Sequence, residues 1–267
     1  MTIEAKKQRL AALLKAHGPL GVAFSGGADS AFLVAMANNE LQDRAVALTS
    51  VGPMHAARER AEANRMAERI GIRHILVKTD RMTAEEFIQN RPDRCYACKK
   101  MIWAELRKAA ESMGIFHLAD GVSTDDLNEH RPGLAAGAEA GVISPLAMAG
   151  FSKAEIREVS RQMGLLTWNK PAGTCLATRI PYGTRITPEI LAMIEQAEEV
   201  LITAGYAFCR VRYHGGTARI EVAPEAVESL VAAAVRKPVT EQLKKIGFPH
   251  VSLDLSGYRS GSLDVIR

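Results

Sequence analysis

The sequence predicts an α/β protein with a doubly wound parallel sheet, followed by a smaller C-terminal α+β domain. From residue 20 onward, short apolar runs alternate with longer amphipathic runs, as strands and crossover helices do. After residue 187 a helical stretch precedes two strand-like segments that alternate apolar and polar residues. Between these parts lies a stretch rich in Pro and Gly. We therefore expect a first domain in 1–168, a crossing segment in 169–186 and a second domain in 187–267.

The elements of the first domain follow in order. The apolar runs predict strands at 20–24, 45–51, 74–80, 116–120 and 141–147, and the amphipathic runs predict helices at 31–39, 55–71 and 95–114. A further helix begins at Ser152, because Ser152 and Glu155 have the spacing of a capping box, and it ends near Gly164. A parallel sheet of this kind binds ligands at the carboxyl ends of its strands.

The crossing segment contains Pro171, Gly173, Pro181 and Gly183 and has no sustained period. A long ordered segment of this kind is usually functional. Beyond it, Thr187 and Pro188 begin a helix. The remaining predicted elements of the second domain are a β-hairpin with strands at 207–214 and 218–223, a helix at 224–237 and a strand at 250–255.

Composition limits the possible classes of protein. The chain has 267 residues, of which 47% are hydrophobic and 24% charged, as in globular proteins. Its net charge of +4 suits ligands that carry phosphate and is too weak to argue for nucleic acid. No run approaches the roughly 18 apolar residues of a membrane span. We therefore expect a cytoplasmic protein that binds neither nucleic acid nor membrane. Its four cysteines are expected to be reduced thiols, metal ligands or catalysts rather than a disulfide framework.

The stretch FSGGADS, residues 24–30, lies between a predicted strand and a predicted helix. Backbone N–H groups and a helix N-terminus favour an anion there. The alternative is an ordinary turn, but two serines and an aspartate coincide with the glycines. The stretch lacks the lysine and the spacing of the GxxxxGK[ST] loop. The residues predicted to bind phosphate are Ser25, Gly26, Gly27, Asp29 and Ser30, with Asp29 also available to Mg²⁺.

This stretch resembles the SGGxDS loop of the PP-loop ATP pyrophosphatases. Those enzymes cleave ATP between its α and β phosphates and adenylate a carbonyl or carboxylate oxygen. The resemblance narrows the class of reaction but leaves the substrate open.

Three of the cysteines lie in unusual surroundings. Cys95 and Cys98 are neighbours on one helical turn among basic residues, which favour thiolates, and Cys175 lies in the crossing segment. Three thiolates could hold three corners of a [4Fe–4S] cluster, or bind zinc with a fourth ligand. Cys209, which shares its strand face with Val211, is expected in the core.

Four stretches together resemble the LarE family: SGGADS, RCYACKK, ADGVSTDDLNEHRPG (119–133) and KPAGTCLATRIPYGTRI (170–186). RVRYHGGTARIEV (210–222) and GYRSGSLD (257–264) match as well, so the resemblance spans nearly the whole chain. These enzymes are ATP-dependent sulfurtransferases that act on a pyridinium dicarboxylate mononucleotide and help to build the nickel-pincer cofactor of lactate racemase. The resemblance implies ATP, Mg²⁺, an acyl-adenylate, a thiocarboxylate product and a homo-oligomer.

The family has two branches. In one, the cysteine that matches Cys175 gives up its own sulfur and becomes dehydroalanine. In the other, three cysteines hold a [4Fe–4S] cluster whose open iron carries a sulfide that comes from an outside donor. Because the chain has Cys95, Cys98 and Cys175, the resemblance favours the cluster branch, with all three as catalytic and metal-binding residues. The sacrificial route needs Cys175 alone and stays open.

Other polar residues are candidates for the same site. Arg210 and Arg212 share a strand face and could clamp a phosphate or carboxylate, or could lie on a solvated face. Arg179 could neutralise charge on the adenylate, or form a surface salt bridge. The remaining candidates are Asp125 and Asp126, for Mg²⁺, ribose or a helix cap, and Glu198 and Glu221, for the substrate or as solvated charges.

Three other functions remain as alternatives. A tRNA thiolation enzyme would use the same ATP chemistry, but only 5% of the residues are aromatic and there is no strong basic stripe. An amide-forming ligase would not need three placed cysteines. A zinc-stabilised binding module would leave SGGADS unexplained, and release of pyrophosphate from ATP would exclude it.

Overall fold

The computed structural model describes residues 1–127, 132–171 and 173–258. The chain folds as two units, which are Met1–Arg81 with Asp93–Gly173, and Met82–Pro92 with Thr174–Arg267. The second unit thus takes a short segment from within the first part of the sequence. Of the motif stretches quoted above, residues 128–131, 172 and 259–264 lie outside the described residues.

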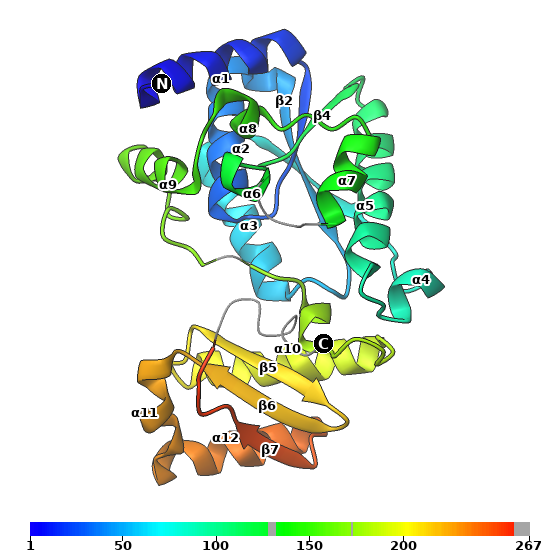
Figure 1. Cartoon of the computed structure of the whole chain (residues 1–267), viewed down its shortest axis with the longest axis vertical. Coiled ribbons are helices and arrows are strands. Elements are labelled where there is room, and N and C mark those ends of the chain that lie inside the picture. Colours follow the sequence, from blue (N-terminus) through cyan, green and yellow to red (C-terminus); the bar gives the residue numbers. More distant parts are fainter. Residues whose placement is uncertain (128–131, 172, 259–267) are drawn as a thin grey trace. The chain divides into compact units, whose positions relative to one another are not determined.

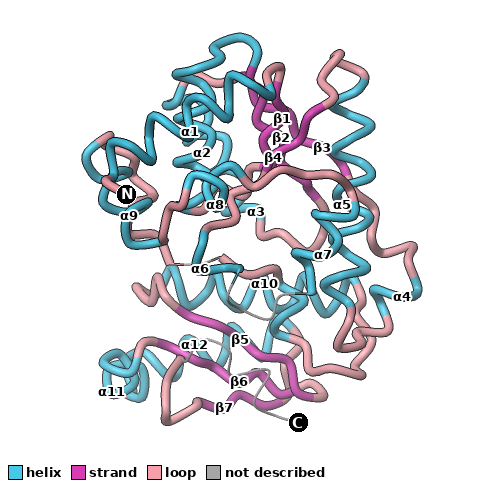
Figure 2. The backbone as a smooth tube through the Cα atoms, turned by 45° about the horizontal axis from the view of Figure 1, so that its top comes forward, coloured by secondary structure: helices cyan, strands magenta, loops and turns pink. Residues whose placement is uncertain are grey.

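The first unit is built on a parallel four-stranded sheet in the order β3-β2-β1-β4 (Figure 2). Its strands are β1 (Leu20–Ala23), β2 (Ala45–Val51), β3 (Arg73–Lys78) and β4 (His117–Ala119). Its helices are α1 (Ile3–His17), α2 (Ala28–Leu41), η1 (Gln42–Arg44), α3 (Ala57–Ile70), α5 (Arg94–Glu111), α6 (Thr124–Leu127), α7 (Pro132–Glu139), α8 (Pro145–Ala149) and α9 (Lys153–Gln162).

Alternating residues of the central strands pack into two hydrophobic cores, one on each face of the sheet. Ala45 and Ala47 of β2 pack with α1, α2, α3 and α9, whereas Val46 and Leu48 pack with α5 and α7 (Figure 1). A strand covered on both faces must be apolar on both, which explains the unbroken apolar run of β2. The predicted doubly wound parallel domain is confirmed.

The predicted strand at 141–147 is wrong. Only Ile143 pairs there, in an isolated parallel bridge with Ala119. Pro145 follows and starts α8, because proline has no N–H for a ladder but fits the first turn of a helix. The capping box of Ser152 and Glu155, by contrast, is present at the start of α9.

The second unit has a three-stranded sheet in the order β5-β6-β7. Its elements are α4 (Glu85–Ile88), η2 (Leu176–Arg179), α10 (Pro188–Thr203), β5 (Cys209–His214), β6 (Thr217–Val222), η3 (Pro224–Ala226), α11 (Val227–Val231), α12 (Ala233–Ile246) and β7 (His250–Leu253). The hairpin turn uses Gly215 and Gly216, both at positive φ. The single helix predicted at 224–237 is broken, because Ala232 takes an extended backbone between α11 and α12.

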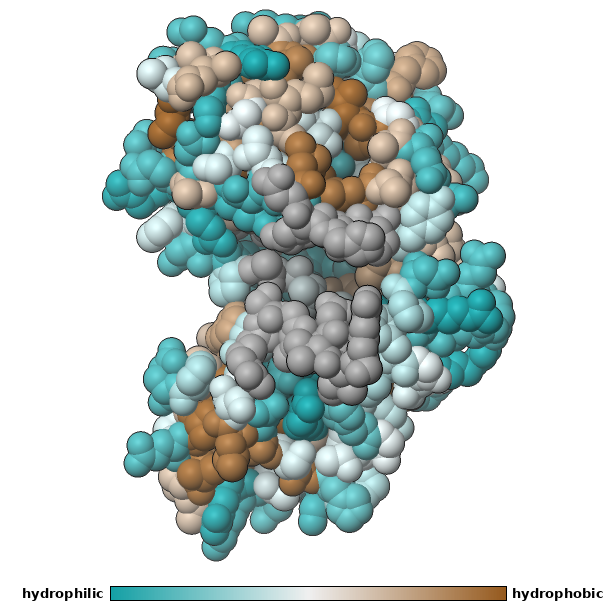
Figure 3. Space-filling view, in the orientation of Figure 1, coloured by the Kyte–Doolittle hydropathy of each residue, from teal (hydrophilic) through white to brown (hydrophobic). Residues whose placement is uncertain are grey.

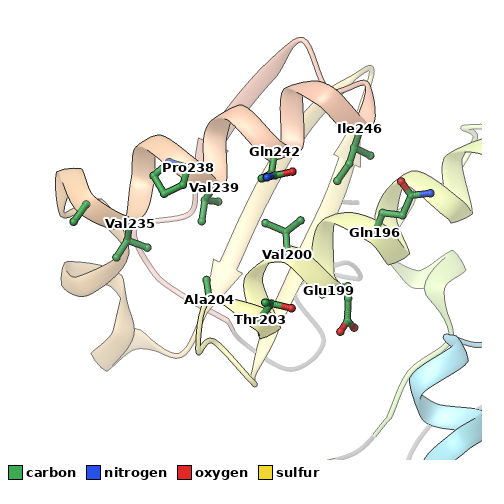
Figure 4. A pocket seen from close by; sticks show the side chains of 11 residues that line it. Gln196, Glu199, Val200, Thr203, Ala204, Val235, Pro238, Val239, Gln242 and Ile246 are labelled. Carbon is green, nitrogen blue, oxygen red and sulfur yellow. The ribbon is translucent and has the colours of Figure 1, made fainter.

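The surface of the second unit carries apolar groups that the site does not use. Figure 3 shows hydrophobic side chains gathered near α11, where Val231 is 45% exposed. A groove of about 590 Å³ lies between α10 and α12, with Val200 and Val239 among its lining residues (Figure 4). None of the predicted site residues lines this groove. Among the helices that the structure describes, none has the length and apolarity needed to cross a membrane.

Asn90 ties the early segment of the second unit to the chain beyond Cys175. Its side-chain amide, fully buried, donates to the carbonyls of Pro181 at 2.8 Å and Thr184 at 2.9 Å. Its backbone carbonyl accepts from Gly183 N at 3.0 Å, and its φ is +56°, a conformation that asparagine tolerates. The buried Asn90 side chain therefore provides hydrogen-bond donors for the carbonyls of an irregular turn.

We predict that Asn90→Ala lowers the free energy of unfolding by about 2–4 kcal/mol, because it leaves buried carbonyls without a donor and puts alanine at positive φ. Denaturant unfolding measures this. The control is Glu86→Ala, an exposed residue nearby, which should stay within about 0.5 kcal/mol of wild type. Equal stability of the two variants would contradict the anchoring role of Asn90.

Candidate active site

The predicted phosphate loop begins where β1 ends, and its start is fixed on both sides. Phe24 N donates to Leu48 O at 2.8 Å, which prolongs the pairing of β1 with β2. Thr49 Oγ1 donates to Phe24 O at 2.6 Å. The chain therefore leaves the sheet in one direction before it turns into α2.

Within the loop, Ser25 and Ser30 face each other across the glycines. Their Oγ atoms lie 3.1 Å apart, and Ser30 Oγ donates to Gly27 O at 3.2 Å. Gly27 caps α2 without a side-chain hydrogen bond, and Asp29 lies in the first turn. The first amides of a helix have no intrahelical acceptor, so this turn can bind an anion.

Two glycines make the loop possible. Gly26 has a φ of +72°, and a Cβ there would lie 3.1 Å from Ala63 Cβ on α3. Gly121, which follows β4, approaches the start of α2 so closely that a Cβ would lie 3.0 Å from Ser30 N. A side chain at either position would therefore displace the loop or its supports.

The cysteine pair lies at the start of α5. Cys95 is exposed and Cys98 half-buried, and both thiols are free of disulfides. Arg81, which is 1% exposed, donates from Nη1 to Cys98 Sγ at 3.4 Å. Its Nη2 donates to Ser50 Oγ at 2.8 Å and Thr79 Oγ1 at 2.7 Å. A buried guanidinium thus favours negative charge at Cys98.

Sequence reasoning missed Arg81. The available signal was its place just past the third strand, where an α/β sheet collects functional groups. The pKa of His55 reflects the positive charge of this region. Burial lowers that pKa to about 4, and the positive charges of Arg81, Lys99 and Arg60 contribute to the decrease. His55 is therefore uncharged near neutral pH, and the cations around it make this end of the sheet suited to anions.

The acidic residues after β4 have defined structural contacts. Asp125 accepts from the backbone N–H of Lys153, at the start of α9, at 2.5 Å. Asp126, 3% exposed, accepts from Ser123 N at 2.9 Å and pairs with Lys153 Nζ at 2.8 Å. These contacts agree with the capping alternative. A role in binding ATP or Mg²⁺ stays a prediction for both residues.

Sequence reasoning also passed over Asp120, which directly follows β4 beside Gly121. Its Oδ1 accepts from Ser144 Oγ at 2.7 Å and from Val122 N at 3.2 Å. Burial raises the pKa of Asp120, and these hydrogen bonds oppose that rise. A carboxyl group in this setting, next to the phosphate loop, was indicated only by its place at a strand end.

In the second unit, Cys175 caps the short helix η2 and is half-buried. Its carbonyl accepts from Thr178 Oγ1 at 2.8 Å and from Arg179 Nη1 at 3.1 Å. Arg179 is 2% exposed and binds Glu198 through two hydrogen bonds, of 2.8 and 3.0 Å. Glu198 Oε1 also accepts from Val211 N at 3.1 Å. The turn that carries the thiol is therefore fixed to α10 and β5.

A second buried ion pair supports the same turn. Arg212 binds Glu221 through hydrogen bonds of 3.0 and 2.9 Å and donates to Thr178 O at 2.8 Å. Arg219 Nη2 donates to Glu221 Oε1 at 2.9 Å. Glu221 is 1% exposed, so it balances guanidinium charge inside the protein rather than lying on a solvated face.

Arg210 differs from these arginines. Its guanidinium stacks over the rings of Phe208 and Tyr258, and Nη1 donates to Cys209 O at 2.8 Å. Burial and the neighbouring Arg179 lower the pKa of Arg210 below its usual range. Among the described residues no carboxylate forms a salt bridge with it. Arg210 is thus a cation held in place and suited to an anionic ligand.

The structure brings the predicted residues together in two sets. The phosphate loop, the cysteine pair, Asp125 and Asp126 belong to the first unit, and all follow carboxyl ends of parallel strands or lie at the start of helices. Cys175 and the residues around it belong to the second unit. In the part of the chain described, no group of three or more His, Cys, Asp or Glu side chains is arranged to hold a metal ion. Cys209 is buried in the second unit's core, as predicted.

Comparisons with known proteins agree with this geometry. The family model for asparagine synthase matches residues 7–123, which include the phosphate loop. An uncharacterized protein of Synechocystis sp. is 40% identical over 243 residues, 91% of each chain. An uncharacterized protein of Methanocaldococcus jannaschii is 30% identical over 239 residues, 90% of each chain.

A third relative has a described activity. The pyridinium-3,5-bisthiocarboxylic acid mononucleotide synthase of Lactiplantibacillus plantarum is 35% identical over 264 residues, which cover 98% of this chain and 95% of that enzyme. The match therefore covers both units, and the two proteins are similar over nearly their whole lengths. With the phosphate loop at the end of β1, these findings show that the chain belongs to the LarE family of ATP-dependent sulfurtransferases in the PP-loop ATP pyrophosphatase superfamily.

Proposed function

We propose that the enzyme adenylates a carboxylate of a pyridinium dicarboxylate mononucleotide and replaces its oxygen with sulfur. The observation that supports this most is the phosphate loop, Ser25–Ser30, in a chain whose relative makes a pyridinium bisthiocarboxylate mononucleotide. Three of the four cysteines are not fully buried, and two of these, Cys95 and Cys98, belong to the same unit as the loop. The products are a thiocarboxylate, AMP and pyrophosphate.

The first step is adenylation. A carboxylate oxygen of the substrate attacks the α-phosphorus of ATP, the bond to the β-phosphate oxygen breaks, and pyrophosphate leaves. The loop amides and the hydroxyls of Ser25 and Ser30 bind the phosphates, and Asp29 holds Mg²⁺, for which a carboxylate at a helix start is a fitting ligand. Asp125 and Asp126 remain candidates for contacts with ATP, in addition to their observed contacts.

The second step is sulfur transfer. A sulfur nucleophile attacks the carbonyl carbon of the acyl-adenylate, and AMP leaves with the original carboxylate oxygen. We propose that Cys95, Cys98 and Cys175 bind a [4Fe–4S] cluster. The first pair fits two corners, because Cys95 and Cys98 lie one helical turn apart on α5 and Cys98 accepts a hydrogen bond from Arg81. Cys95, Cys98 and Cys175 would be its protein ligands, and the cluster would supply sulfide-level sulfur for the attack.

The alternative keeps the adenylation and uses Cys175 itself. Cys175 Sγ attacks the acyl-adenylate to form a thioester, AMP leaves, and loss of the Cα proton breaks the Cβ–S bond. The sulfur stays with the product and residue 175 becomes dehydroalanine. The half-buried Cys175, fixed by Arg179, is compatible with this route.

We propose that Arg210 and Arg212 bind the anionic groups of the substrate, with Arg179, Glu198 and Glu221 around them. Arg210 supports this most, because it lies over two aromatic rings without a carboxylate partner among the described residues. We further propose that an outside donor provides sulfide and that the enzyme is a homo-oligomer, as the family resemblance implies.

The adenylation step is tested by pyrophosphate release. We expect release that requires ATP, Mg²⁺ and the pyridinium dicarboxylate mononucleotide, and Asp29→Asn should slow it by about 100-fold, because a carboxylate ligand of the metal is lost. Glu40→Gln, on the same helix, is the control. Pyrophosphate release that does not depend on the mononucleotide, or full activity of Asp29→Asn, would contradict the assignment.

The cluster is tested by assays of iron and acid-labile sulfide after anaerobic reconstitution. We expect about four irons per chain in wild type and a loss in each of Cys95→Ala, Cys98→Ala and Cys175→Ala, with Cys209→Ala as the control. Little iron in wild type would exclude the cluster. Mass spectrometry after turnover then tests the sacrificial route, which predicts a loss of about 34 Da at Cys175.

Two arginines on one strand are predicted to respond differently to substitution. Arg212→Gln should lower the free energy of unfolding by about 3–5 kcal/mol, because Glu221 loses a buried partner. Arg210→Gln should leave stability within about 1 kcal/mol and raise KM for the mononucleotide at least about tenfold. Denaturant unfolding and steady-state kinetics measure both. An unchanged KM in Arg210→Gln would refute its role in substrate binding.

A further inference from the structure

Lys170 lies five positions before Cys175 in the sequence, yet its side chain contacts the phosphate loop. Lys170 Nζ donates to Gly26 O at 3.1 Å and pairs with Glu62 Oε2 of α3 at 2.8 Å. The side chains of Lys170 and Glu62 are 24% and 34% exposed, so the contact is partly shielded from water. All three residues belong to the first unit, and none of the roles assigned above involves Lys170.

The contact with Gly26 O controls more than one carbonyl. The peptide unit is planar and trans, so the carbonyl of Gly26 and the N–H of Gly27 are fixed in opposite directions in one plane. Gly26 is at positive φ, where its peptide could turn with little steric penalty. By holding the carbonyl, Lys170 therefore sets the direction of the Gly27 N–H, which belongs to the loop that binds the anion.

The other side of this arrangement comes from α3. Ala63 packs against Gly26, and its neighbour Glu62 holds the Lys170 ammonium. Lys170 is also fixed through its backbone, since Arg157 of α9 donates to the carbonyls of Lys170 at 3.1 Å and Trp168 at 2.9 Å. The loop, α3 and α9 thus all contact one residue, Lys170, the first two through its side chain and α9 through its backbone carbonyl.

We propose that Lys170 is a positioning residue that aligns the phosphate loop for ATP and couples this loop to the segment that leads to Cys175. Because coupling is reciprocal, ATP in the loop stabilises residues 167–171, and loss of Lys170 weakens the binding of ATP. This inference rests on the proposed use of ATP at the loop, but it does not depend on the route of sulfur transfer.

The test measures nucleotide binding without turnover. The probe is Mg²⁺ with an ATP analogue that cannot be cleaved between its α and β phosphates, and affinity is measured by calorimetry. We expect Lys170→Met to weaken binding about tenfold, as for loss of one charge-assisted hydrogen bond, and Lys170→Arg to recover most of it. Lys108→Met, an exposed lysine on α5, is the matched control and should bind as wild type does.

Hydrogen exchange supplies the second measurement. In wild type, the analogue should slow exchange in peptides that span residues 165–171, and Lys170→Met should abolish this effect while Lys108→Met retains it. If Lys170→Met does not fold, Glu62→Gln takes its place, with weaker binding and reduced protection expected, because the ammonium loses its partner.

Binding within twofold of wild type in Lys170→Met, or protection that persists in it, would overturn the proposal. If wild-type protein binds no analogue, the proposed use of ATP fails instead. In that case faster exchange of residues 165–171 in nucleotide-free Lys170→Met than in wild type still supports the anchoring contact, and equal exchange refutes it.

Discussion

The position of the Cys175 thiol depends on a buried ion pair between Arg179 and Glu198. An arginine keeps its charge even when it is buried, so Arg179 requires a carboxylate inside the protein. Glu198 provides one from a regular helix, and the guanidinium uses its remaining N–H groups on the carbonyls of Thr174 and Cys175. The turn that carries Cys175 is thereby tied to α10. Thr178, whose hydroxyl donates to Cys175 O and whose carbonyl accepts from Arg212, supports the same turn.

The need of a buried arginine for a charged partner separates four arginines of the two units into two groups. Arg179 and Arg212 each face a buried carboxylate, so their charges are balanced and they hold the framework. Arg81 and Arg210 contact neutral groups: hydroxyls and a thiol for Arg81, and aromatic rings and a carbonyl for Arg210. Among the described residues, no carboxylate forms a salt bridge with Arg210, and Arg81 donates to Cys98, so both cations are suited to an anionic ligand.

The parts of the structure predicted best are those that local chemistry determines. The glycines and serines of residues 25–30 specify their own loop, and Gly215-Gly216 specifies its hairpin. The burial of Glu198 and Glu221 was not predicted, because burial of a carboxylate can be predicted only when its cationic partner is known. Here the partners lie 19 and 9 positions away in the sequence. The contacts of Lys170 and Asn90 were not predicted either, because their partners are also distant in the sequence. The strand predicted at 141–147 was wrong because the apolar pattern was given more weight than Pro145, which has no N–H for a ladder and starts α8.

The interleaving of the chain also bears on synthesis and inheritance. Residues 82–92 leave the ribosome long before residues 180–186, whose carbonyls and amides they bind through Asn90 and Ile88. The second unit therefore cannot complete its fold until translation is almost finished, while most of the first unit is already available. For the same reason a single recombination event at residue 174 would not transfer the second unit intact. Transfer of the whole second unit would require both of its segments, 82–92 and 174–267.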